Sequence, residues 1–109
     1  MKRFTHPDLS EVSLSEVLHA LSDPCRQRIV RILKEAEGRE LACNEIPLEV
    51  SKATGSHHFE TLRQAGLIKS RADGTKCLSS LREEEVELRF PGLLELVTKE
   101  SGRDVSEVP

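Results

Sequence analysis

Aromatic side chains are scarce in this chain of 109 residues, which has three Phe and neither Trp nor Tyr. Proteins that bind single-stranded nucleic acids on a sheet surface stack the bases on aromatic rings. The composition therefore argues against a base-stacking surface of that kind.

Long apolar runs are missing as well. No run approaches the ~20 residues that cross a bilayer, and the first ten residues, MKRFTHPDLS, carry positive charge without an apolar signal segment. We therefore expect a cytoplasmic protein with no membrane contact. The length suits one domain over residues 1–100, and the polar residues 101–109 are expected to form a disordered tail.

Closely spaced cysteines are also absent. Cys25, Cys43 and Cys77 are odd in number, lie far apart and form no CxxC motif. Neither a disulfide framework nor a structural zinc site is expected, and no other metal or cofactor is predicted. Cys25 keeps the apolar register of its segment and is expected in the core. All three thiols stay open as candidate redox residues.

Charge is distributed unevenly along the chain. The net charge is −3, yet residues 51–82 hold six Lys or Arg against two Asp or Glu, whereas residues 83–109 hold three against eight. A basic face on an acidic protein can bind a polyanion such as DNA. Chance clustering explains the charge pattern equally well when it is taken alone.

The first half of the chain predicts three helices. Ser13 and Glu16 form an S-x-x-E capping box before an amphipathic segment, 14–21. Asp23 followed by Pro24 starts a second helix, which ends by Gly38. The segment LACNEI then predicts a brief third helix.

The second half predicts a helix, a hairpin and a final helix. Ser51 can cap a fourth helix over about 51–65, and two short strands within 68–81 surround a turn with Asp73-Gly74 at its tip. Pro91 can open the last helix. The order α-α-α-α-β-β-α describes a mostly α protein with a small β-hairpin, which is a winged helix-turn-helix.

The fourth helix contains two adjacent histidines in the stretch SKATGSHHFETLRQAGL. At 100° per residue, His57 lies opposite the apolar face, and His58 lies at the flank of that face. The apolar face consists of Gly55, Phe59, Leu62 and Gly66, and Gly55 is expected to allow close approach of a neighbouring helix. Metal-binding histidine pairs on helices are four residues apart, so a shared ion is not expected. His57 is predicted to contact DNA, with plain solvation as the alternative, and His58 to be packed or to touch a phosphate.

A helix-turn-helix reads bases with the first turns of its second helix, and neighbouring cations bind phosphates. Small and polar side chains at the start of the fourth helix fit that role, and the hairpin cations would contact the backbone. Ordinary solvation is the alternative for each residue. The predicted DNA-binding residues are Ser51, Lys52, Ala53, Thr54, Ser56, His57, Arg63, Arg71, Thr75 and Lys76.

Three stretches, LHALSDPCRQRIVRIL, SKATGSHHFETLRQAGLI and RADGTKCLSSLR, resemble the ArsR/SmtB family of bacterial winged-helix repressors, in register over residues 12–98. The resemblance implies a homodimer built from the first and last helices. It implies binding of double-stranded DNA at an inverted-repeat operator, with helix 51–65 in the major groove and wing 68–81 on the backbone or in the minor groove. It also implies release by an effector or by thiol oxidation.

The chain departs from the metal-sensing members of that family. Those members carry an L-C-x-C pair in the third helix or a D-x-H and H-x-x-E/H set in the last helix. Here the corresponding segments read ELACNEI, with one cysteine, and PGLLELVTKE, with no histidine. Neither metal site is present, and the effector is left unidentified.

Two other classes of function are alternatives to DNA binding. The acidic C-terminal segment fits a winged-helix module that binds proteins without specific DNA binding. An enzyme is not expected, because the chain has no P-loop, no GxSxG and no metal signature.

Overall fold

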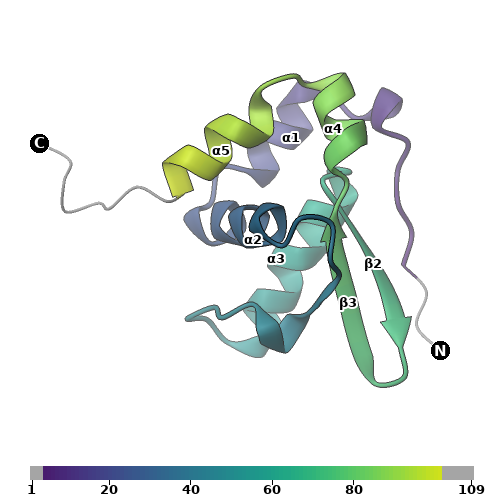
Figure 1. Cartoon of the computed structure of the whole chain (residues 1–109), viewed down its shortest axis with the longest axis vertical. Coiled ribbons are helices and arrows are strands. Elements are labelled where there is room, and N and C mark those ends of the chain that lie inside the picture. The colour runs from purple at the N-terminus through teal and green to yellow at the C-terminus, as the bar shows by residue number, and fades with distance from the viewer. Residues whose placement is uncertain (1–3, 102–109) are drawn as a thin grey trace, which may run out of the picture.

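The computed structural model describes residues 4–101, and residues 102–109, which form most of the expected tail, lie outside this range. The helices lie to one side of a small antiparallel sheet and above it, and the hairpin of the sheet projects away from them (Figure 1). The elements in chain order are η1 (Leu9–Glu11), α1 (Leu14–Ala20), α2 (Pro24–Glu35), β1 (Leu41–Ala42), η2 (Cys43–Glu45), α3 (Lys52–Gln64), β2 (Ile68–Asp73), β3 (Lys76–Leu81), α4 (Glu83–Arg89) and α5 (Leu93–Ser101), where η marks a 3-10 helix.

The first two helices begin where their capping residues predict. The Ser13 hydroxyl accepts from the Glu16 amide at 3.1 Å, and the Glu16 carboxylate accepts from the Ser13 amide at 3.3 Å. Asp23 accepts from the amides of Cys25 and Arg26 at 2.7 Å and 3.3 Å, with Pro24 in the first turn. These caps satisfy amides that have no partner inside the helix.

The segment LACNEI does not form the expected α-helix. Its first residues form strand β1, in which Leu41 pairs with Ser79 and Ala42 with Leu78, and only a 3-10 turn, η2, follows. The free edge of β3 supplies backbone partners that a helix over this segment would leave unused. β1 gives the sheet a third strand in the order β1-β3-β2.

The predicted order of elements also lacks one helix that the structure contains. The acidic segment after the hairpin forms α4, which is separate from α5. Three consecutive glutamates, Glu83 to Glu85, occupy the first turn of α4, where the helix dipole favours negative charge.

The hairpin forms as predicted, with its turn one residue further along. β2 and β3 pair from Ile68 with Leu81 to Asp73 with Lys76, which leaves Gly74 and Thr75 as the two-residue loop. Gly74 has a φ of 62°, a left-handed value typical of such tight turns.

The core lies between α2, α3 and the sheet, with α5 packed across α2 (Figure 1). Gly66 follows α3 with a φ of 77°, and a Cβ there would lie 2.7 Å from Leu9 Cδ2. Gly55 is buried as predicted, but a Cβ would meet only side chains of the preceding loop, Leu48 at 3.7 Å and Val50 at 3.9 Å. The expected close approach of a helix at Gly55 is therefore wrong. None of the helices over residues 4–101 has the length and apolarity to span a membrane.

Candidate nucleic-acid interface

The first two turns of α3 present small polar side chains to solvent. The Ser51 hydroxyl accepts from the Thr54 amide at 3.1 Å and donates to the Thr54 hydroxyl at 2.9 Å, which fixes the start of the helix. The exposed side chains that follow are those of Lys52, Ala53, Thr54, Ser56 and His57, all on the predicted DNA-binding list. Because Ala53, Thr54 and Ser56 are small, this end of α3 can come close to the floor of a DNA groove.

The two histidines lie in different environments, as their helical phase predicts. His57 is exposed, whereas His58 is only 7% exposed and its Nδ1 lies 3.0 Å from Arg26 Nη1. Arginine only donates, so His58 Nδ1 is the acceptor and its neutral ring carries the proton on Nε2. The ring centroids are 6.2 Å apart. His57 is available for an external partner, and His58 is part of the packing.

Arg26 is a buried residue that the sequence analysis missed. Besides His58, its guanidinium donates to the carbonyl oxygens of Ala20 at 2.6 Å and His19 at 3.3 Å. It therefore ties the end of α1 and the middle of α3 to α2. Its position three residues before the buried Ile29, on the same face of α2, is the signal that could have revealed this role.

A cluster beside Arg26 has the residue types of a metal site. Asp23, Cys25 and His58 each place one ligand atom within 4.8 Å of the others. The Arg26 guanidinium donates to one of these groups, however, and its positive charge opposes a cation. Burial alone would raise the pKa of Asp23, but the amide hydrogen bonds from Cys25 and Arg26 outweigh it and lower that pKa. The cluster therefore acts as a helix cap with a packed histidine.

The residues predicted to contact the DNA backbone, Arg63 at the end of α3 and Arg71, Thr75 and Lys76 in the hairpin, differ in how many internal contacts they make. Thr75 and Lys76 are exposed at the hairpin tip. Arg71 instead makes two hydrogen bonds with the Glu40 carboxylate, at 2.7 Å and 2.8 Å. Arg63 is half-buried, donates to the Ser70 hydroxyl at 3.3 Å and stacks 4.5 Å from the Phe4 ring centroid. Of these four residues, Thr75 and Lys76 at the tip make no such contact with any residue in the range 4–101 that the structure describes.

The N-terminal arm covers the outer edge of β2, an arrangement that no sequence pattern indicated (Figure 1). His6 Nε2 accepts from the Ser70 amide at 3.0 Å, and Arg82 donates to the Pro7 carbonyl at 2.8 Å. Burial and the charges of Arg82, Arg63 and Lys69 lower the pKa of His6, because they disfavour its cationic form. The arm protects an edge that could otherwise pair with another strand.

Two of the three cysteines lie together. Cys43 starts η2 directly after β1, Cys77 is in β3, and the two thiols are close enough for Cys77 to affect the titration of Cys43. Burial of the thiol, together with the neighbouring Cys77, raises the pKa of Cys43 to about 11, although the residue as a whole is exposed. Cys25 is half-buried rather than in the core, and burial followed by the Asp23 charge raises its pKa.

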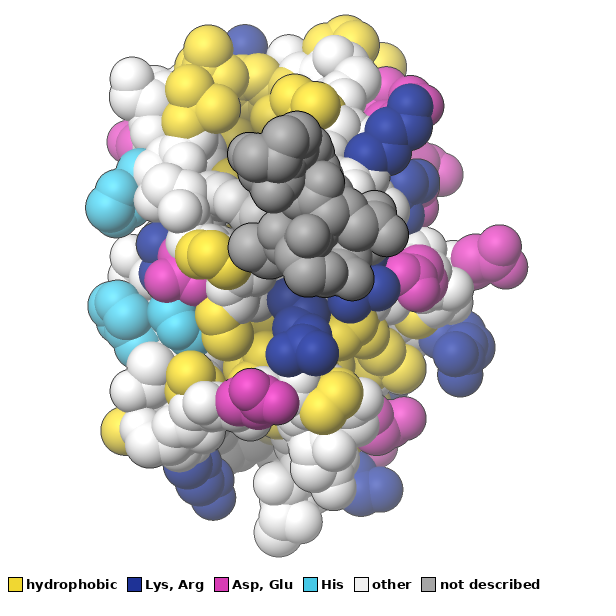
Figure 2. All heavy atoms as spheres, turned by 90° about the vertical axis from the view of Figure 1, so that its left-hand side faces the viewer, with side chains coloured by type: hydrophobic (Ala, Val, Ile, Leu, Met, Phe, Trp, Pro, Cys, Tyr) yellow, Lys and Arg dark blue, Asp and Glu magenta, His cyan; other side chains and the backbone are white. Residues whose placement is uncertain are grey.

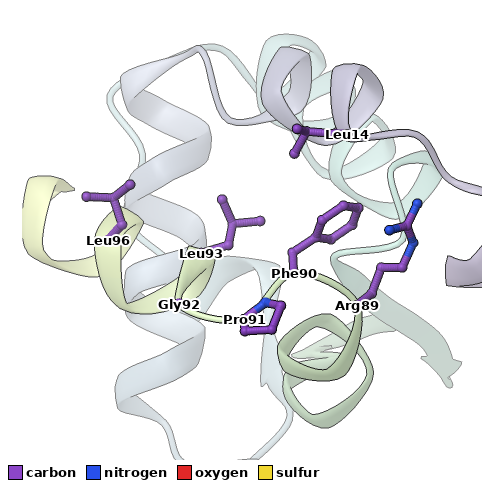
Figure 3. Close-up of a pocket in the computed structure, with 7 residues that line it drawn as sticks. All are labelled: Leu14, Arg89, Phe90, Pro91, Gly92, Leu93 and Leu96. Carbon is purple, nitrogen blue, oxygen red and sulfur yellow. The ribbon is translucent and has the colours of Figure 1, made fainter.

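Apolar side chains are exposed at the opposite end of the molecule from the hairpin tip. Figure 2 shows them at the top, where Figure 1 places α1, α4 and α5. Leu14, Leu18 and Leu96 are 50%, 52% and 60% exposed. Leu14 and Leu96 line an open hollow of about 460 Å³, in which Leu14 points toward Phe90 (Figure 3).

Comparison with known proteins agrees with this architecture. Residues 21–71 match a model described as a helix-turn-helix domain. The uncharacterized HTH-type transcriptional regulator YceK of Bacillus subtilis is 41% identical over 83 residues, which cover 74% of this chain and 82% of YceK.

Two solved structures share the fold. Reduced HlyU from Vibrio cholerae is 25% identical, with a TM-score of 0.63 over 82% of this chain and 88% of HlyU. An ArsR-like transcriptional regulator from Rhodococcus is 23% identical, with a TM-score of 0.59 over 80% of this chain and 81% of that one, and supports the fold alone. Together with the shared motifs, these matches show that the chain belongs to the ArsR/SmtB family of DNA-binding helix-turn-helix transcriptional regulators.

Proposed function

We propose that the protein is a repressor that binds an inverted-repeat operator as a homodimer, with α3 in the major groove and the β2–β3 hairpin on the backbone or in the minor groove. The observation that carries this proposal is the exposed start of α3, where small and polar side chains surround His57. A recognition helix contacts base edges with its N-terminal residues.

Each exposed residue of this surface suits a particular contact. Lys52 can reach a guanine, the Ala53 methyl can touch a thymine methyl, and the hydroxyls of Thr54 and Ser56 can bond to base edges or phosphates. His57 is assigned to a base edge. Thr75 and Lys76 at the hairpin tip are assigned to the backbone, because both are exposed and the hairpin follows α3 directly in the chain.

Contacts of Arg63 and Arg71 with DNA phosphates are less well supported by the structure than by the sequence alone. Arg71 would have to leave the Glu40 carboxylate to reach a phosphate, and Arg63 would have to leave Ser70 and Phe4. We therefore assign both residues to positioning the hairpin in the free protein, with Arg71 the better placed to exchange its partner.

A homodimer through α1 and α5 fits the exposed leucines at the end away from the hairpin tip. Leu14 and Leu96 line one hollow, and a second copy of this face would cover both. In a two-fold dimer, two α3 helices would enter successive major grooves, about 34–36 Å apart. The half-sites should therefore be inverted and one helical turn apart.

Binding to selected DNA and to random DNA separates base reading from general attraction. Sites are first selected from random duplexes with the purified protein, and affinities are then measured at several salt concentrations. His57→Ala should weaken specific binding by about tenfold, or ~1.4 kcal/mol, which lies within the ~1–3 kcal/mol expected for one base contact, and leave binding to random DNA nearly unchanged. His19→Ala, which removes another exposed histidine, is the matched control and should change neither affinity.

The hairpin residue Lys76 should behave differently from His57. Lys76→Ala should weaken binding to both kinds of DNA and reduce the salt slope by about one. Equal losses on both kinds of DNA for His57→Ala would remove its base-reading role. No binding by the wild-type protein at low salt would instead favour a protein-interaction module. The effector that releases the operator is not assigned by these residues.

A further inference from the structure

The exposed face of α3 continues beyond His57 with two side chains that are not among the predicted DNA-binding residues. Glu60 and Gln64 are both exposed. At 100° per residue they lie within about 60° of His57 around the helix axis, and Ala53 lies on the same side. These four residues come from successive turns and form one stripe along α3. A helix that lies along the major groove contacts bases from successive turns, so Glu60 faces the same groove as His57.

Glu60 carries the only negative charge of α3. Arg63, three residues further on, is the cation best placed to neutralise it. The Arg63 guanidinium instead donates to the Ser70 hydroxyl and stacks on the Phe4 ring. In the part of the chain that the structure describes, the carboxylate has one hydrogen bond, in which Gln64 Nε2 donates to Oε1 at 3.3 Å. The second oxygen, Oε2, is therefore open to an external donor.

An unneutralised carboxylate on this surface repels phosphates, so it does not serve general attraction to DNA. It does suit a hydrogen-bond donor on a base edge. In the major groove, cytosine presents only its N4 amino donor, whereas adenine presents the N7 acceptor beside its amino group. Guanine and thymine present acceptors and no donor. Cytosine is therefore the base that a carboxylate fits best.

We propose that Glu60 selects a cytosine in each half-site by accepting from its N4 amino group through Oε2, and that Gln64 positions the carboxylate by holding Oε1. The inference rests on the proposed function, because it requires α3 in the major groove. A rise of ~1.5 Å per residue places Glu60 about 4.5 Å beyond His57 along the helix. Because base pairs are ~3.4 Å apart, the cytosine lies next to the pair that His57 contacts.

The charge of Glu60 discriminates against other bases as well as favouring cytosine. Opposite guanine or thymine the carboxylate meets acceptor atoms, and it loses contact with water without gaining a donor. A glutamine at this position would have nearly the same shape without the charge, and it could bond to N6 and N7 of adenine together. The Glu60→Gln exchange therefore separates selection by charge from simple contact.

Base preference is measured by selecting sites from random duplexes with the wild-type chain and with two Glu60 variants. The wild type should require a C·G pair at one position of each half-site and lose about tenfold in affinity when that pair is replaced. Glu60→Gln should select an A·T pair there, and Glu60→Ala should accept all four pairs. Both variants should bind random DNA a few-fold more strongly, because a charge that repels phosphates is gone.

Three further variants give the controls. Glu84→Gln removes the same charge from an exposed position on α4 and should select the wild-type site with unchanged affinity. His57→Ala should keep the requirement for cytosine, because it alters the neighbouring contact. Gln64→Ala should still select cytosine but with a preference reduced a few-fold. An unchanged preference in Gln64→Ala would overturn its positioning role.

The outcomes separate this inference from the DNA-binding function itself. Selection of the wild-type site by both Glu60 variants would show that Glu60 only repels phosphates, and would overturn the proposal. Specific binding by the wild type without a required cytosine would overturn it too, while leaving the DNA-binding function intact. No DNA binding by the wild type at low salt would refute the proposed function and this assignment together.

Discussion

At the scale of single residues, the hydrogen bond between His6 and Ser70 makes the N-terminal arm sensitive to pH. His6 accepts at Nε2, so a protonated ring cannot keep this bond. Burial and nearby cations hold the pKa of His6 below its ordinary value of 6.5. The unfolded chain therefore takes up the proton first as the pH falls below 6.5, and the contribution of His6 to stability declines from there until its folded pKa is passed.

We expect the His6 ring to titrate below pH 6.5 by NMR and the Ser70 amide resonance to shift with the same midpoint. The His6→Ala variant should lose the pH-dependent shift at Ser70. A Ser70 amide that titrates unchanged in that variant would show that another group controls this edge.

Arg26 provides a second test at the residue scale. Arg26→Ala would remove the hydrogen-bond donor of three acceptors, the Ala20 and His19 carbonyl oxygens and His58 Nδ1. The bonds to Ala20 and His58 are buried. We expect a loss of about 2–4 kcal/mol in the free energy of unfolding, measured by urea denaturation. Arg28→Ala, an exposed change on the same helix, should cost no more than about 0.5 kcal/mol. Similar losses of stability for both variants would mean that the hydrogen bonds of the Arg26 guanidinium contribute little to the free energy of unfolding.

At the scale of elements, two glycines with left-handed backbone differ in their surroundings. Gly66→Ala and Gly74→Ala both place a Cβ in a disfavoured conformation, which costs about 1–2 kcal/mol. Only at Gly66 would the new Cβ also press on Leu9, at 2.7 Å, while nothing lies within 4 Å at Gly74. Thermal unfolding should therefore show the larger loss for Gly66→Ala. The reverse order would contradict the packing of η1 against the end of α3.

Local signals explain which elements the sequence could predict. The caps Ser13, Asp23 and Ser51 act within three residues of themselves, and all three start helices as expected. Strand β1 has only two residues and exists because β3 lies beside it, so no local pattern indicates it. Because β1 was not predicted, the nearness of Cys43 to Cys77 was not predicted either.

In the candidate DNA-binding site, too, features that depend on nearby residues could be predicted from the sequence, and features that depend on distant residues could not. Helical phase within α3 separates His57 from His58, because both belong to one continuous helix. The partners of Arg71 and Arg63 come from Glu40, Ser70 and the arm, which only folding brings near them. The sequence therefore identified the exposed start of α3 but overstated how many of the predicted backbone-contacting cations are free of internal partners.

At the scale of the whole molecule, the proposed dimer should be disrupted by a charge placed on the exposed leucines between its subunits. Leu96→Glu would place a carboxylate on the apolar hollow shared with Leu14, and burial of an unpaired charge is costly. We expect this variant to sediment as a monomer and to lose at least about tenfold in affinity for the inverted repeat.

The matched control is Leu88→Glu, on a leucine of α4 that is 84% exposed and does not line the hollow. It should leave the dimer and its DNA affinity unchanged. A dimer that survives Leu96→Glu but dissociates with Leu88→Glu would move the subunit contact to α4.

The pair between Arg71 and Glu40 has a consequence for how the whole molecule meets DNA. The Glu40 carboxylate holds the guanidinium in the two-point manner in which a phosphate would hold it. Glu40→Gln should therefore strengthen binding to random DNA at low salt, by a few-fold for one added cation contact; unchanged binding would show that Arg71 stays away from the duplex. If Arg71 exchanges partners, Glu40 acts as a built-in competitor of the nucleic acid. It would keep the hairpin from adhering to arbitrary sequences and leave the choice of site to α3.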